Sequence, residues 1–167
     1  MRLLLFSLSL LSISDPVSAA AVPSENIIKS CLHAKALPPI SQLEIETTEI
    51  FFQPDYRPGY STEYVVFRGK EVGYATSRRG GAILYDGRLH PIRRSTTLVQ
   101  TRSRQKPEVR LELAGWSLIR EGREEYLCVA DHFDGLGRSG SFQKVRYAYL
   151  LNTRKNAGLF FVDGLVD

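Results

Sequence analysis

Two acids, a histidine and two serines lie close together in one short stretch, DHFDGLGRSGS, from Asp131 to Ser141. His132 beside Asp131 or Asp134 offers a general base with an acid to orient it, so an envelope hydrolase using His132 is one hypothesis. However, neighbours this close in sequence usually point in different directions, and no nucleophile-elbow motif accompanies them. We therefore favour a protein without enzymatic activity, and a hydrolase using His132 is the alternative hypothesis.

The same stretch offers few ligands for a metal ion. Asp131 and Asp134 precede Gly135, but His132 and Phe133 interrupt the alternating oxygen ligands that a calcium loop needs. Elsewhere, two cysteines and three scattered histidines show no ligand spacing. We expect no metal site and no other cofactor.

A protruding recognition loop is the third interpretation of this stretch. Three glycines let the backbone adopt positive φ angles and remove side-chain bulk. Small polar loops beside aromatic residues are typical of protein-binding surfaces, and a strand rich in aromatics follows. A plain hairpin connection is the alternative. The loop side chains that we expect to bind a partner are Arg138, Ser139 and Ser141.

Ser139-Gly140 followed by an aromatic residue also resembles the inhibitory loop of small periplasmic lysozyme inhibitors. Those proteins are exported, rich in β structure and of similar size. The resemblance covers only a few residues. It implies a loop that enters the active-site cleft of an enzyme, and we carry over no site residue from it.

Basic residues concentrate in the middle of the chain. The net charge is +4, but Arg68 to Arg110 holds eleven Lys or Arg against three acids. A positive surface attracts an acidic protein or an anionic envelope polymer, whereas a solvated surface without a partner is the alternative. Nucleic acid is disfavoured because no row of aromatics is clearly interleaved with the basic residues. The candidate binding residues lie near predicted turns and are Arg78, Arg79, Arg93, Arg94, Arg102 and Arg104.

The first residues have the pattern of a secretory signal peptide. Met1-Arg2 precedes an apolar run, Leu3 to Ser14, which is followed by a break and by small residues suited to signal peptidase. We expect residues 1–20 to be removed, leaving 21–167 as a single exported β-rich domain without a membrane span. The expected location is the periplasm or the extracellular medium. A buried N-terminal helix is the alternative.

The number of cysteines is consistent with the predicted export. Cys31 and Cys128 make an even pair, which in an oxidising compartment predicts a disulfide bond. Two buried free thiols are the alternative. Closing so long a loop stabilises a fold by about 4–5 kcal/mol in the chain-entropy model.

The elements that hold these residues are predicted to be mostly strands. Ser24 to Leu37 has apolar residues at helical spacing and ends before two prolines, which predicts one short helix. Eight to ten short strands follow, with Asp86-Gly87 as a hairpin turn. We expect Trp116, Tyr147 and Tyr149 in the core. The predicted fold is mainly β, an antiparallel meander curled into a barrel or sandwich with one N-terminal helix packed on it.

Together these patterns favour an exported, non-enzymatic binding protein that recognises an anionic macromolecule. An inhibitor or immunity factor of an envelope-active enzyme is the role we consider for it. A hydrolase using His132 and a structural envelope component remain the alternatives.

Overall fold

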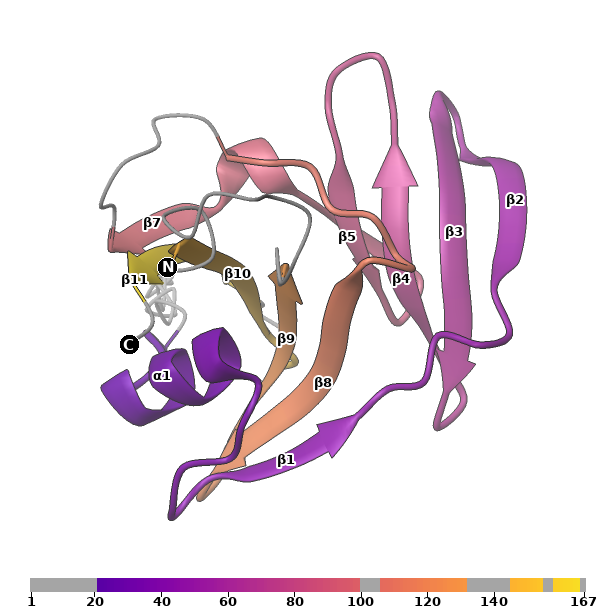
Figure 1. The fold of residues 1–167 in the computed structure, drawn as a ribbon. Helices are drawn as coiled ribbons and strands as arrows, with labels where there is room; N and C mark the ends of the chain where they lie inside the picture. The colour runs from indigo at the N-terminus through magenta and orange to yellow at the C-terminus, as the bar shows by residue number, and fades with distance from the viewer. Residues whose placement is uncertain (1–20, 100–105, 132–144, 155–157, 166–167) are drawn as a thin grey trace, which may run out of the picture.

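The computed structural model describes residues 21–99, 106–131, 145–154 and 158–165. These residues form one α-helix and eleven strands arranged in two sheets (Figure 1). The prediction of a mainly β fold is confirmed. Of the two predicted forms, the structure agrees with the sandwich, because the described strands make two open sheets and not one closed barrel.

The larger sheet has six strands in the order β1-β8-β9-β10-β11-β7. Its centre is an antiparallel meander of β8 (Ala114–Glu121), β9 (Glu124–Asp131), β10 (Val145–Asn152) and β11 (Leu159–Leu165).

The two edges of this sheet depart from the predicted simple meander. β1 (Ser41–Glu44) pairs antiparallel with β8, and β7 (Thr96–Val99) pairs parallel with β11. Hairpin signals predict pairing between strands that follow one another. The two edge pairs join segments that are far apart in sequence, so no turn motif predicts them.

The smaller sheet is a consecutive meander in the order β2-β3-β4-β5-β6. The predicted Asp86-Gly87 turn joins its last two strands, and both residues have positive φ, 51° and 70°, as the tight hairpin turn requires. A short 3₁₀ helix, η1 (Ile92–Arg94), follows β6. The strands of this sheet are β2 (Phe51–Arg57), β3 (Tyr60–Phe67), β4 (Lys70–Thr76), β5 (Ala82–Tyr85) and β6 (Arg88–Pro91).

The main core lies between the two sheets. Trp116 and Tyr149 from the larger sheet pack in one buried cluster with Val72 and Ile83 from the smaller sheet. Trp116 and Tyr149 are therefore core residues as predicted, and Tyr147 packs partly buried against the same cluster.

Helix α1 (Glu25–His33) lies on the other face of the larger sheet (Figure 1). Ser24 caps its N-terminus by accepting a hydrogen bond from the Ile27 amide at 3.2 Å. The helix ends at His33, earlier than the sequence pattern predicts, because Ala34 adopts φ 51° and its amide bonds back to the last turn. No helix in the described part of the chain is long and apolar enough to span a membrane.

The predicted disulfide between Cys31 and Cys128 is present and joins α1 to β9. Its Cα atoms are 5.7 Å apart, and the two residues are 97 positions apart in sequence. Both cysteines are buried in a second cluster, where Ile27 and Leu32 of the helix meet Leu150 and other residues of the sheet. The link therefore ties the first element of the described chain to the centre of the larger sheet.

Candidate functional site

Two of the predicted basic segments meet at one end of the smaller sheet. The amide of Ile92 donates a hydrogen bond to the carbonyl of Gly81 at 3.0 Å. This contact places η1 beside the turn between β4 and β5. The two joined segments carry four exposed arginines, which we call the arginine cluster: Arg78, Arg79, Arg93 and Arg94.

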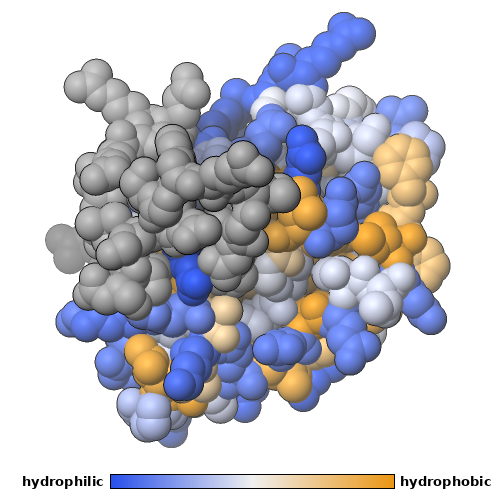
Figure 2. Space-filling model, viewed as in Figure 1, coloured by the Kyte–Doolittle hydropathy of each residue, from blue (hydrophilic) through white to orange (hydrophobic). Residues whose placement is uncertain are grey.

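The turn between β4 and β5 is closed by its own hydrogen bonds. The Ser77 hydroxyl donates to the carbonyl of Gly80 at 2.8 Å and accepts from the amide of Arg79 at 3.1 Å. Gly80 has φ 106°, a conformation that favours glycine. Because the backbone polar groups are satisfied locally, the two arginine side chains are left to project into solvent. Hydrophilic residues accordingly extend over this turn at the top of Figure 2.

A buried anchor positions the other two arginines. Ile92 is 5% exposed and packs in the main core. The Ser95 hydroxyl donates to the carbonyl of Ile92 at 2.8 Å and closes the single turn of η1. The arginines that follow Ile92 therefore stand on the surface of a short element whose position is set by the core.

Lys106 adds a fifth cation to this end of the sandwich. Its ammonium group donates to the carbonyl of Ser95, directly after η1. Burial lowers the pKa of Lys106 from its ordinary value. The lysine thereby holds its own segment against Ser95, the residue that directly follows η1.

No described carboxylate forms an ion pair with the arginine cluster. The ion pairs found between described residues lie elsewhere, for example Lys70 with Asp86 and Arg120 with Glu125. Like charges on neighbouring turns raise the local positive potential, and an ion of opposite sign relieves it. Within the part of the chain that the structure describes, the four guanidinium groups remain available to an external anion.

The strands that lead into and out of residues 132–144 are tied to the same end. Tyr149 donates to the carbonyl of Pro107 at 2.5 Å, next to Lys106. Tyr147 donates to the carboxylate of Asp131 on the neighbouring strand. Burial and the Asp131 carboxylate raise the pKa of Tyr147, so its hydroxyl keeps its proton and holds the two strands together.

Several predicted site residues lie outside the described residues. They are Arg102, Arg104, His132, Arg138, Ser139 and Ser141. The four described arginines of the predicted binding set lie on two segments that the hydrogen bond between Ile92 and Gly81 joins. The hydrolase alternative depends on His132 and stays a prediction.

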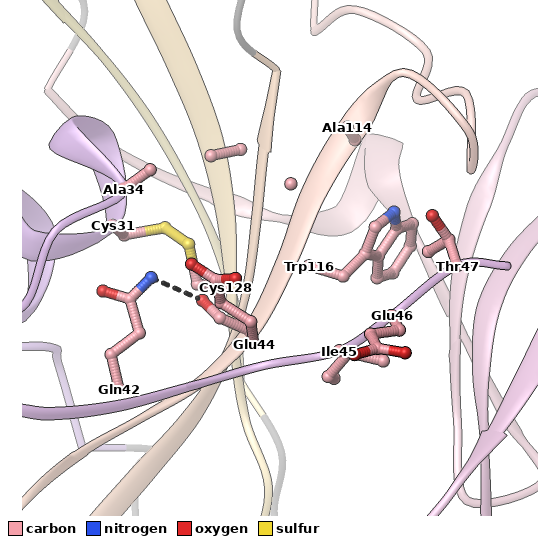
Figure 3. A pocket seen from close by; sticks show the side chains of 13 residues that line it. Cys31, Ala34, Gln42, Glu44, Ile45, Glu46, Thr47, Ala114, Trp116 and Cys128 are labelled. Carbon is pink, nitrogen blue, oxygen red and sulfur yellow. Dashed lines mark hydrogen bonds between the residues drawn. A yellow bond between two sulfur atoms is a disulfide. The ribbon is translucent and has the colours of Figure 1, made fainter.

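A hollow of about 350 Å³ lies beside the disulfide bond. Figure 3 shows Gln42 and Glu44 next to the Cys31–Cys128 bridge, with Trp116 farther along the hollow, near Ile45. Gln42 donates to the Ser117 hydroxyl at 3.3 Å. The lining holds the carboxylates of Glu44 and Glu46 and the hydroxyls of Thr47 and Ser117, but among the described residues no hydrogen bond joins a carboxylate to either hydroxyl.

Metal binding finds no support in the described residues. No group of three or more His, Cys, Asp or Glu side chains among them is arranged to hold a metal ion. The two cysteines are joined in the disulfide bond and cannot act as thiolate ligands.

Sequence reasoning missed a second hollow, of about 490 Å³, on the inner face of the smaller sheet. It lies between β3 and β4 and the segment that leads into β8, and Glu63, Glu108 and Glu112 line it. Phe52 stands at its side with 65% of its surface exposed. The pair Phe51-Phe52 was a usable signal, because adjacent residues of a strand face opposite sides and both phenylalanines cannot enter one core.

Exposed guanidinium groups on neighbouring turns can each form paired hydrogen bonds to a carboxylate, sulfate or phosphate. The arginine cluster can therefore form charge-assisted hydrogen bonds to anionic groups. Comparison of the chain with protein-family models, curated proteins and solved structures found no match.

Proposed function

We propose that the protein is an exported, non-enzymatic binding protein that recognises an anionic macromolecule through the arginine cluster. The partner is an acidic protein or an anionic envelope polymer. Inhibition of, or immunity to, an envelope-active enzyme is the role that such binding would serve. The signal-peptide pattern of residues 1–20 and the disulfide bond support export, because structural disulfides persist in oxidising compartments.

The contact between Ile92 and Gly81 carries the proposal. It joins the backbone segments that carry the two basic dipeptides, at an end of the sheet that Ile92 anchors in the core, and this supports a shared binding surface. Rigid presentation reduces the conformational entropy lost on binding. At physiological salt the charges act over about 8 Å, so neighbouring arginines reinforce one another whereas distant ones do not.

The proposal is tested with two variants of equal net charge. Arg78→Gln/Arg93→Gln removes one arginine from each half of the cluster. Arg68→Gln/Arg123→Gln removes two exposed arginines from turns that lie elsewhere, between β3 and β4 and between β8 and β9. Affinities for dextran sulfate and for polyglutamate are measured at several salt concentrations, so that sulfate polymers and acidic polypeptides are compared directly.

The variant Arg78→Gln/Arg93→Gln should bind each polyanion about thirtyfold more weakly at low salt, because each of the two removed cations contributes roughly 1 kcal/mol to binding an anionic surface. The turn variant should bind like the unmodified protein. Equal losses in the two variants would mean that only net charge matters, and the localised site would then be rejected.

The two alternatives make different predictions in the same setting. A hydrolase using His132 would lose turnover on His132→Ala while its binding to polyanions stayed unchanged. A structural envelope component would co-sediment with envelope polymer and bind no acidic polypeptide.

A further inference from the structure

The hollow missed by sequence reasoning adjoins the arginine cluster but has the opposite charge. Thr76 lines it, and Thr76 directly precedes the turn that carries Arg78 and Arg79. We call this hollow the acidic groove. Its lining residues are Phe52, Ser61, Glu63, Tyr74, Thr76, Glu108, Val109, Arg110 and Glu112.

Strand register places three of these residues in one row. Phe52 pairs with Glu63, and Glu63 pairs with Tyr74, across β2, β3 and β4. Tyr74 belongs to the main core, but Glu63 is exposed and Phe52 is 65% exposed. The inner face of the smaller sheet thus continues past the edge of the core and remains open there. Hydrophobic residues show at the right of Figure 2, over the region of β2 and β3.

The groove carries more negative than positive charge. Glu63, Glu108 and Glu112 are all exposed, and Arg110 is the one cation in the lining. Among the described residues, no ion pair joins Arg110 to any of the three carboxylates. An incoming cation would therefore find unneutralised carboxylates on both walls, and a polyanion would be repelled.

A buried hydroxyl without a partner lines the same groove. Tyr74 is 4% exposed, and its hydroxyl lies close to the backbone of Val109 but makes no well-formed hydrogen bond with a described residue. Burial, followed by the charge of Glu108, raises the pKa of Tyr74 to about 12. The hydroxyl is shielded from solvent and lies against Gly81, so it is an unsatisfied polar group in the wall of the groove, where buried hydroxyls are nearly always hydrogen-bonded.

We infer that the acidic groove binds an arginine or lysine side chain of a protein partner, beside the anionic surface that the arginine cluster recognises. The exposed ring of Phe52 offers a face for a cation, and the glutamates offer charge-assisted hydrogen bonds. The inference rests on the proposed function for the anionic half of the partner. It makes that partner a protein with charges of both signs, since a uniform polyanion would occupy the arginine cluster alone.

The probe is the blocked peptide acetyl-Gly-Arg-Gly-amide, compared with the same peptide carrying citrulline, which has nearly the same shape but no charge. Binding to the exported protein is followed by amide chemical shifts at low salt. We expect saturable shifts at residues of the groove with the arginine peptide alone. Glu63→Gln/Glu112→Gln should weaken binding about fivefold to tenfold, as expected for two partly exposed ion pairs.

Two controls accompany this variant. Glu44→Gln/Glu46→Gln removes two exposed carboxylates that line the other hollow and should leave the affinity within about twofold. Phe52→Leu keeps an apolar side chain but removes the ring, and it should weaken the arginine peptide about threefold. Thermal unfolding of each variant shows whether it is folded, and Phe52→Leu serves as the test if the glutamate variant is not.

Equal binding of the citrulline peptide, absence of saturable shifts, or equal losses in the two glutamate variants would overturn the inference. The arginine-cluster variant Arg78→Gln/Arg93→Gln should keep its affinity for the peptide. Peptide binding without polyanion binding would therefore refute the proposed function alone, and polyanion binding without peptide binding would refute the groove alone.

Discussion

Removing the disulfide bond should destabilise the protein strongly and free helix α1 first. The change is Cys31→Ala/Cys128→Ala, which also avoids leaving a free thiol. With the two cysteines 97 residues apart, the chain-entropy model predicts a loss of about 4–5 kcal/mol in the free energy of unfolding. The two cysteines are also almost fully buried, so their packing contributes to the loss.

The expected fall in the midpoint of thermal unfolding follows from this loss. A domain of this size shifts by about 2–4 °C for each kcal/mol, so the midpoint should fall by roughly 10–20 °C. Circular dichroism measures the midpoint, with and without a reducing agent. Reductant should lower the midpoint of the unmodified protein to about that of the variant and leave the variant itself unchanged.

Hydrogen exchange locates the effect. The helix meets the larger sheet through one cluster, with Ile27, Leu32 and the Cys31 sulfur at its centre. Amides of α1 should exchange faster in the variant, while amides of β3 and β4 should keep their protection, because the bridge lies in the cluster between α1 and the larger sheet. A fall of less than about 3 °C, or uniform loss of protection across both sheets, would refute this account of the disulfide as a local clamp.

Three further predictions concern the core, the pH dependence and the N-terminus. Trp116→Ala should lower the free energy of unfolding, measured with urea, by about 3–5 kcal/mol. The ring is 3% exposed, and its Nε1 donates to the Leu111 carbonyl at 3.0 Å. A loss below about 1 kcal/mol would contradict its place in the core. Burial, followed by the charge of Arg88, lowers the pKa of His90. This histidine therefore stabilises the fold above its unfolded pKa of about 6.5, and the contribution is lost as pH falls below that value. Urea unfolding of His90→Gln should show a smaller decrease between about pH 7.5 and pH 5.5 than the unmodified protein, and an unchanged slope would count against it. N-terminal sequencing of the exported protein should begin close to Ala21, whereas retention of Met1 would refute the signal peptide.

The arginine cluster was partly predictable from the sequence. Arg78-Arg79 stand next to Gly80, and Arg93-Arg94 follow β6 after one intervening residue; such connections collect at the ends of a β-sandwich. That they share an end depends on the hairpin of β5 and β6, which the Asp86-Gly87 turn already indicates. The hydrogen bond between Ile92 and Gly81 that places them side by side is a tertiary contact without a local signal.

The sequence could indicate only one part of the acidic groove, the exposed phenylalanine of the Phe51-Phe52 pair. Phe52 and Glu63 face each other because β2 pairs with β3, but Glu108 and Glu112 come from a segment far along the chain. Their meeting depends on how the segment between residues 106 and 113 crosses the open end of the sandwich. No turn motif or periodicity encodes that crossing, because it is fixed by the burial of Val109 and Leu111 in the core.

Local sequence determined the features that depend on near neighbours: the cap of α1 at Ser24, the alternation that buries Tyr149, and the type I′-like turn at Asp86-Gly87. The count of two cysteines left one possible intramolecular disulfide, and the structure shows that it forms. Tertiary structure alone decided that β1 joins β8, that β7 runs parallel to β11, and that surfaces of opposite charge lie side by side. Such pairings form when two apolar faces bury each other, and the energy of that burial depends on both partners together, which no single stretch of sequence contains.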